Sequence, residues 1–123
     1  MTKFIFSFLA LGFMLFFLGV HSSLSAQHPL PRIYEDGGYQ GASINLTCSE
    51  ENLHRYGWGD LISSSVVPQG WTLVFYEHTG YRGATFTVNE GRIYHYRDFG
   101  WNDTPSSVLV YHHGVQQDDC RWR

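Results

Sequence analysis

The residues best suited to chemistry in this chain lie in one short loop, Asn102-Asp103-Thr104-Pro105-Ser106-Ser107. This loop offers a carboxylate, a hydroxyl group and free backbone carbonyls within a few positions of each other. A hard cation such as Ca²⁺ takes about six to eight oxygen ligands of these kinds at about 2.3–2.6 Å. The loop therefore predicts an oxygen-lined cation site. The alternative is a plain tight turn, because Asp, Asn and Ser are turn formers in any case.

Other chemistry has weaker support in the sequence. Ser, His and Asp are all present, but no nucleophile-elbow or comparable motif groups them, so catalysis is not indicated. His112 and His113 are adjacent in the chain. Neighbouring residues on a strand face opposite sides, so this pair is not expected to form a two-ligand metal site. Asn45 begins an N-glycosylation sequon and falls on the polar phase of a predicted strand, where a glycan would fit.

The loop belongs to a unit that occurs twice. Residues 34–42 return 42 positions later as residues 76–84, and residues 56–64 return 43 positions later as residues 99–107. Two separate blocks that repeat in the same order predict two similar halves that share one core. Trp58 and Trp101 repeat in register, so both are expected in that core, each beside its loop.

Short strands joined by glycine-rich turns are predicted in both halves. Residues 42–46 and 84–88 alternate small or apolar residues with polar ones, which is typical of half-buried strands. Further strands are expected at residues 32–34, 66–67, 72–76 and 109–111. About eight antiparallel strands in two equivalent sets predict two sheets packed face to face. A helical turn is expected only within residues 49–55, with Ser49 as its cap.

The repeated residues resemble a known motif. An aromatic residue, four residues, a second aromatic, one residue and a glycine, followed by an Asn/Asp-Asn/Asp-x-x-Ser/Thr-Ser loop, resembles the βγ-crystallin Greek-key motif. Both parts occur in both halves, across residues 30–112. The resemblance implies an all-β sandwich of two Greek-key motifs, at about residues 30–68 and 69–113. The expected domain is then residues 27–113, followed by a C-terminal tail of residues 114–123.

The resemblance also implies a metal. Members of this family that bind calcium hold two ions, each shared between the loops of both motifs. The ligands implied here are the side chains of Asp103 and Ser106 with the carbonyls of Leu61 and Glu35 at one ion, and the side chains of Asp60 and Ser63 with the carbonyls of Thr104 and Glu77 at the other. The first loop departs from the pattern, because Gly59 stands where Asn or Asp is expected and Asn102 keeps it in the second loop. That position braces the loop, so its loss is expected to lower the order of the first loop and its affinity.

Residues 1–26 have the layout of a secretory signal peptide. Lys3 precedes an apolar run at residues 4–20, and small residues then lead to Gln27, so cleavage is expected after Ala26. The alternative is an uncleaved membrane anchor, whose apolar run of about 17 residues is at the short limit for a bilayer. The mature chain is therefore expected to be secreted and extracellular, with no stable membrane insertion after cleavage.

The charge of the chain bears on its binding partners, and its two cysteines bear on a disulfide. The formal net charge is −3 and no basic cluster is present, which argues against nucleic acid or an anionic membrane as the main partner. Cys48 and Cys120 are the two cysteines, and in a secreted chain they are expected to form a disulfide that pins the tail to the first repeat. Two free thiols or an intermolecular pair are the alternatives.

The sequence therefore supports a leading function and two alternatives. The leading one is a secreted, calcium-binding module that its ions stabilise. The second is a secreted effector, an inhibitor or an antimicrobial or toxin-like protein, that binds a protein or cell-surface target through loops such as residues 94–101, which carry Arg, Tyr and Trp. The third is a purely structural protein like a lens crystallin, against which the signal peptide argues.

Overall fold

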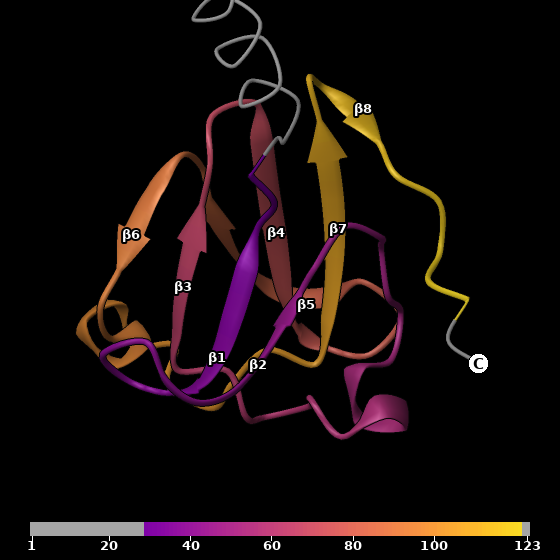
Figure 1. Cartoon of the computed structure of the whole chain (residues 1–123). Helices are drawn as coiled ribbons and strands as arrows, with labels where there is room; N and C mark the ends of the chain where they lie inside the picture. The colour runs from indigo at the N-terminus through magenta and orange to yellow at the C-terminus, as the bar shows by residue number, and fades with distance from the viewer. Residues whose placement is uncertain (1–28, 122–123) are drawn as a thin grey trace, which may run out of the picture.

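The computed structural model describes residues 29–121, so the predicted signal peptide lies outside the described residues. Within this range the chain forms eight strands and two short 3-10 helices. In chain order they are β1 (Arg32–Asp36), β2 (Gln40–Asn45), η1 (Leu53–Tyr56), β3 (Ser64–Val67), β4 (Trp71–His78), β5 (Arg82–Val88), β6 (Gly91–Ile93), η2 (Tyr96–Phe99), β7 (Ser107–His112) and β8 (Val115–Gln116). The strands make two four-stranded antiparallel sheets (Figure 1), which confirms the predicted all-β fold. None of the helices in this range is long and apolar enough to cross a membrane.

Each sheet combines segments from both halves of the chain. The first sheet has the order β2-β1-β3-β6, and Figure 1 shows β6, from the second half, at its outer edge beside β3. In the pairing of β3 with β6, Ser65 lies opposite Ile93 and Val67 lies opposite Gly91. The second sheet has the order β5-β4-β7-β8, and the first half adds an isolated bridge between Glu50 and Val108. That bridge is the repeat counterpart of the Ser65–Ile93 pair, so neither half completes a sheet alone.

The core lies between the two sheets and follows the alternation of the strands. In β4 the side chains of Trp71, Leu73 and Phe75 are buried, while the residues between them are half-buried. Tyr96 of η2 is fully buried and packs edge-on against Phe75 and Phe86, with ring centroids 5.8 and 5.3 Å away. Its burial raises the pKa of the Tyr96 hydroxyl.

The repeated tryptophans are in register but unequally buried. Trp58 is 8 % exposed and belongs to the core. Trp101 is half-buried and stacks on Phe86, with ring centroids 5.5 Å apart. Phe86 also contacts Phe99, which is 58 % exposed, with ring centroids 5.4 Å apart. The prediction that both indoles are core residues therefore holds fully only for Trp58.

A hairpin of the same geometry opens each half. The tyrosine pairs Tyr34–Tyr39 and Tyr76–Tyr81 pack edge-on at 5.8 Å in both copies. The second tyrosine of each pair has a left-handed backbone, with φ of 61° and 59°, and the glycine two positions later also has positive φ, 76° and 86°. Glycine adopts this conformation without steric cost, whereas a bulky residue does so rarely. The repeated glycines are therefore explained by the hairpin backbone.

The C-terminal segment is part of the second sheet. β8 pairs with the end of β7, so Val115 and Gln116, which the sequence assigns to the C-terminal tail, are part of this sheet. The backbone N–H of Cys120 donates to the carbonyl of Ser49 at 2.7 Å. Cys48 and Cys120 form a disulfide with their Cα atoms 4.9 Å apart, which confirms the predicted pairing. The Tyr81 hydroxyl donates to Asp119 at 3.1 Å, and its burial and this bond raise the pKa of Tyr81.

The predicted helical turn begins later than expected. η1 is capped by Asn52, whose side chain accepts a hydrogen bond from the backbone N–H of His54 at 3.1 Å. The prediction of Ser49 as the cap is wrong, because the buried Ser49 hydroxyl accepts the backbone N–H of Val110 in β7 at 2.9 Å instead. A second turn, η2, lies at the equivalent place in the other half and has no counterpart in the sequence-based prediction.

Candidate cation site in the paired loops

Two loops hold the predicted ligand residues, one between η1 and β3 and one between η2 and β7. Each begins at a left-handed glycine that ends the 3-10 helix, Gly57 with φ of 78° and Gly100 with φ of 76°. Each also carries an aspartate in the left-handed region, Asp60 with φ of 54° and Asp103 with φ of 52°. Aspartate is one of the few non-glycine residues that adopt this region readily. The two carboxylates are therefore presented by turns of the same shape.

Reciprocal backbone hydrogen bonds hold the loops against each other. The N–H of Asp60 donates to the carbonyl of Pro105 in the second loop at 2.9 Å. The N–H of Asp103 donates to the carbonyl of Ile62 in the first loop, with a longer distance of 3.4 Å. Because each aspartate is tied to the opposite loop, its side chain lies beside the serine of that loop.

The side chains accordingly form two clusters that cross between the loops. The Ser63 hydroxyl donates to Asp103 Oδ1 at 3.1 Å and lies 3.5 Å from the carbonyl oxygen of Leu61. The Ser106 hydroxyl donates to Asp60 Oδ1 at 3.2 Å. The resemblance placed Asp103 with Ser106 and Asp60 with Ser63, whereas the structure pairs each aspartate with the serine of the other loop.

The other predicted ligand residues lie beside these clusters. Glu35 and Glu77 follow directly on Tyr34 and Tyr76, whose carbonyls accept the N–H groups of Ser63 and Ser106 at 3.0 and 2.9 Å. Glu35 is thus next to the Asp103 cluster and Glu77 next to the Asp60 cluster. Thr104 lies within the second loop, where its hydroxyl donates to the carbonyl of Asn102 at 3.0 Å. All eight predicted ligand residues therefore lie in the paired loops or at the strand ends beside them.

The oxygen donors of the two clusters suit a hard cation, which they would bind with low affinity. Each cluster has one carboxylate, and among residues 29–121 no three His, Cys, Asp or Glu side chains converge on one point. A cation would therefore take most of its oxygen ligands from hydroxyls, carbonyls and water. The side chain of Asp60 is 57 % exposed, so water has access to that cluster. These oxygen donors fit Ca²⁺, whereas a soft metal ion would need thiolate or several imidazole ligands.

The first position of the two loops is filled in different ways. Asn102 donates from Nδ2 to Asp103 Oδ2 at 3.0 Å, the bracing contact that this position was expected to provide. Gly59 has no side chain, and the imidazole of His54 lies in the space that a Cβ there would need. His54 Nε2 is 3.2 Å from the Ser106 hydroxyl and 3.8 Å from Asp60 Oδ2. Sequence reasoning missed His54, because it lies outside the loop motif.

The role of the last serine of each loop was also missed in the sequence analysis, although Ser64 and Ser107 occupy the same position of the repeat. Ser64 donates to the carbonyl of Asp36 at 2.6 Å and accepts the N–H of Tyr39 at 3.1 Å. Ser107 likewise donates to the carbonyl of His78 at 2.7 Å and accepts the N–H of Tyr81 at 3.1 Å. In each Ser-Ser pair the first serine therefore contacts an aspartate, and the second closes the tyrosine hairpin.

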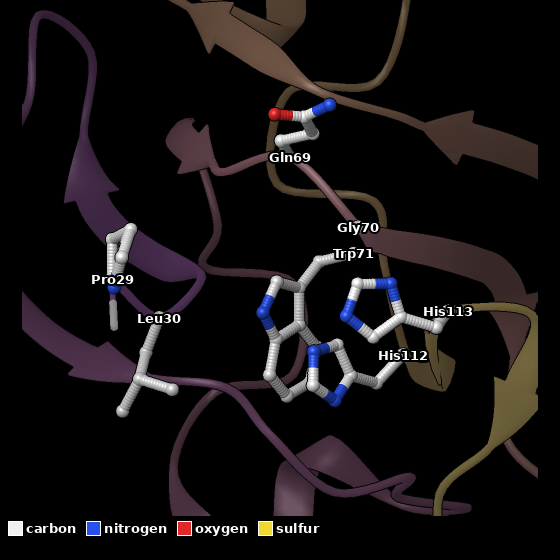
Figure 2. Close-up of a pocket in the computed structure, with 7 residues that line it drawn as sticks. All are labelled: Pro29, Leu30, Gln69, Gly70, Trp71, His112 and His113. Carbon is white, nitrogen blue, oxygen red and sulfur yellow. The ribbon is translucent and has the colours of Figure 1, made fainter. Parts of the chain in front are cut away.

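A pocket of about 570 Å³ lies at the other end of the sandwich, where β4 begins and β7 ends. It is lined by Pro29, Leu30, Gln69, Gly70, Trp71, His112 and His113 (Figure 2). His112 stacks on Trp71 at 4.0 Å, and its ring centroid is 4.2 Å from that of His113. The prediction that the two histidines face opposite sides is wrong, because β7 ends at His112 and His113 has a left-handed backbone with φ of 50°.

Comparison with known sequences points to one family. Over residues 32–109 the chain matches the sequence profile of the family described as Beta/Gamma crystallin. It is 30 % identical to Gamma-crystallin F of Bos taurus over 91 residues, which are 68 % of this chain and 51 % of the bovine protein. It is 28 % identical to Beta/gamma-crystallin of Ciona intestinalis over 77 residues, 63 % of this chain and 90 % of the ascidian protein. The chain thus spans about half the length of its bovine relative.

Solved structures agree with these matches. A βγ-crystallin domain from Flavobacterium johnsoniae superposes with a TM-score of 0.61 at 30 % identity, covering 71 % of this chain and 99 % of that domain. A βγ-crystallin domain from Clostridium beijerinckii gives a TM-score of 0.59 at 29 % identity, covering 68 % of this chain and 98 % of that domain. The profile match at residues 32–109 contains both tyrosine hairpins and both loops. This chain is therefore a member of the βγ-crystallin family.

Proposed function

We propose that this protein is a secreted calcium-binding βγ-crystallin domain, in which two ions shared between the paired loops stabilise the fold. The observation that carries the proposal is the crossed pairing of Asp103 with Ser63 and of Asp60 with Ser106. Each cluster joins a carboxylate from one half to a hydroxyl from the other. An ion bound at either cluster would therefore tie the two halves together.

Each ion has a defined donor set in this proposal. One ion takes the side chains of Asp103 and Ser63 with the carbonyls of Leu61 and Glu35. The other takes the side chains of Asp60 and Ser106 with the carbonyls of Thr104 and Glu77. Water supplies the remaining ligands, as it commonly does for calcium in exposed sites.

Added calcium is expected to raise the melting temperature of the mature chain, and a chelator is expected to reverse the rise. An ion that binds only the folded state stabilises it by about 2.7 kcal/mol when its concentration is a hundredfold above Kd. Extracellular modules often bind calcium with Kd of roughly 10⁻⁴–10⁻³ M, so a gain on the order of 1 kcal/mol is expected at millimolar calcium. Differential scanning calorimetry measures the shift, and isothermal titration calorimetry should count two ions per chain.

A matched pair of variants checks where calcium binds. Asp103→Asn removes the carboxylate but keeps a residue that tolerates the left-handed backbone, so it should abolish one of the two ions. Glu90→Gln is the control, because it makes the same chemical change in an exposed turn between β5 and β6, away from the loops. A wild-type melting curve that does not move at millimolar calcium would contradict the proposed function.

Secretion makes a second prediction, which concerns Asn45. In secretory cells the mature chain should begin at Gln27 and carry an N-linked glycan at Asn45, which is exposed at the end of the edge strand β2. The second sequon, at Asn102, should stay unmodified, because Pro105 follows it and its side-chain amide is held by Asp103. Mass spectrometry before and after glycosidase treatment measures both sites. An intact segment of residues 1–26 in secreted material would contradict the proposal.

A secreted effector is the second candidate function, and exposed aromatic side chains favour it. Tyr94 and Phe99 are each 58 % exposed and lie within the segment 94–101. Large exposed aromatics of this kind are common at protein interfaces. This function does not need calcium. A domain that captures a defined extracellular target equally well with calcium and with chelator, and loses it in Phe99→Ser, would favour the effector.

A further inference from the structure

The first loop has lost its bracing side chain, and a histidine occupies the vacated space. A Cβ built on Gly59 would overlap three atoms of the His54 ring. A side chain at position 59 and the imidazole in its present place therefore exclude each other. At the matching position of the second loop, Asn102 reaches the carboxylate of Asp103 directly. The counterpart of His54 in the second repeat is Arg97, so the second half has no imidazole at this position.

The contacts of His54 lead straight to the cation cluster. Its Nε2 lies 3.2 Å from the Ser106 hydroxyl, and that hydroxyl donates its only hydrogen to Asp60 Oδ1 at 3.2 Å. The bond between His54 and Ser106 is therefore donated by an Nε2–H group. The same nitrogen is 3.8 Å from Asp60 Oδ2. Ser106 keeps a second lone pair that can face a cation while the first accepts from His54.

The backbone of η1 fixes the ring in this place. The side chain of Asn52 accepts the N–H of His54 at 3.1 Å, and the N–H of Trp58 donates to the carbonyl of Leu53 at 2.9 Å. Leu53 and Trp58 are both buried, so the turn that carries His54 is anchored in the core on both sides. The backbone that carries the imidazole is consequently anchored in the core, and the ring itself contacts Ser106 and lies over Gly59.

We propose that His54 is a positioning residue that replaces the missing side chain at position 59 and holds Ser106 and Asp60 in the arrangement that binds the cation. This inference rests on the proposed calcium function. Partners that orient metal ligands from behind typically contribute about 10–100-fold to metal affinity. His54→Ala is therefore expected to weaken calcium binding at the Asp60 cluster by about tenfold or more. Binding at the Asp103 cluster should stay unchanged.

The structure also predicts a rescue. Gly59→Asn alone restores the family pattern, yet it is not expected to tighten binding, because its side chain collides with the His54 ring. In the double variant His54→Ala/Gly59→Asn the space is free, and the new amide can brace Asp60 as Asn102 braces Asp103. The double variant should therefore regain most of the affinity that His54→Ala loses. His54→Gln, which keeps a side-chain N–H donor, should lose less than His54→Ala.

The test measures calcium affinity by titration calorimetry on the full mature chain in an Asp103→Asn background, so that only the Asp60 cluster is observed. Amide hydrogen exchange of residues 57–63 without calcium is the second readout. Faster exchange and weaker binding in His54→Ala, both reversed by Gly59→Asn, support the inference. Equal affinity and equal exchange in His54→Ala overturn it, and so does a loss that Gly59→Asn fails to reverse. If the wild type binds no calcium, the proposed function fails, whereas the exchange experiment still decides whether His54 braces the loop.

Discussion

Trp58→Ala is expected to lower the free energy of unfolding by about 3–5 kcal/mol, the usual cost of removing a large buried aromatic side chain. Trp58 is 8 % exposed and belongs to the core between the sheets, so its loss leaves a cavity next to the first loop. Trp101→Ala should cost less, about 1–2 kcal/mol, because the half-buried Trp101 mainly covers Phe86. Urea unfolding of the two variants measures the difference.

Phe99→Ala is the control for this comparison. It removes a ring that packs on Phe86, as Trp101 does, but is already 58 % exposed, so the loss of stability should be smaller than in either tryptophan variant. Equal losses for Trp58→Ala and Trp101→Ala would contradict the unequal burial of the two indoles. Equal losses would instead support the prediction from the sequence repeat that both indoles are equivalent core residues.

Removal of the Cys48–Cys120 disulfide is expected to have an effect of similar size. The two cysteines are 72 positions apart, and closing a loop of that length stabilises a fold by about 4 kcal/mol in the chain-entropy model. For a domain of this size such a loss lowers the melting temperature by roughly 15–30 °C. The double variant Cys48→Ala/Cys120→Ala, compared with wild type by calorimetry, measures the effect.

The bonds around the disulfide supply its control. The backbone of Cys120 still donates to Ser49 in the double variant, and β8 still pairs with β7, so the variant should keep its native sheet content by circular dichroism. Wild-type protein treated with a reductant should melt at the same temperature as the double variant. A melting temperature that falls by only a few degrees would show that the strand pairing alone holds the tail.

The parts of the fold that could be predicted are those with a strong local pattern. Residues 42–46 and 84–88 alternate small or apolar residues with polar ones and largely coincide with β2 and β5, and both tyrosine hairpins repeat nearly residue for residue. β6 has only three residues, Gly91–Ile93, and they show no alternation. Its pairing with β3 in the first sheet could therefore not be predicted from the sequence. The bridge between Glu50 and Val108 is a single residue pair, so it could not be predicted either. Pairing between distant segments depends on the whole core, which short-range patterns do not record.

The same division applies to the candidate site. The eight candidate ligand residues are those that the family resemblance implies, and they lie in the paired loops or at the strand ends beside them. The pairing of Asp60 with Ser106 could not be predicted, because it depends on which loop lies against which strand end. The position of His54 could not be predicted either, since its ring fills the space that a side chain at position 59 would occupy. Because His54 lies outside the loop motif, its contact with the loop is seen only in the three-dimensional structure.

Each half of the chain contributes one segment to the sheet of the other half, β6 to the first sheet and the Glu50 bridge to the second. A polypeptide with only one of the two motifs would lack either the β3–β6 pairing or the Glu50–Val108 bridge, and its loop would lack the carbonyl that accepts the aspartate N–H group. A second identical copy, related by a two-fold axis, would supply every one of these contacts. The two halves are therefore arranged like the subunits of a symmetric homodimer, with residues 68–70 joining them.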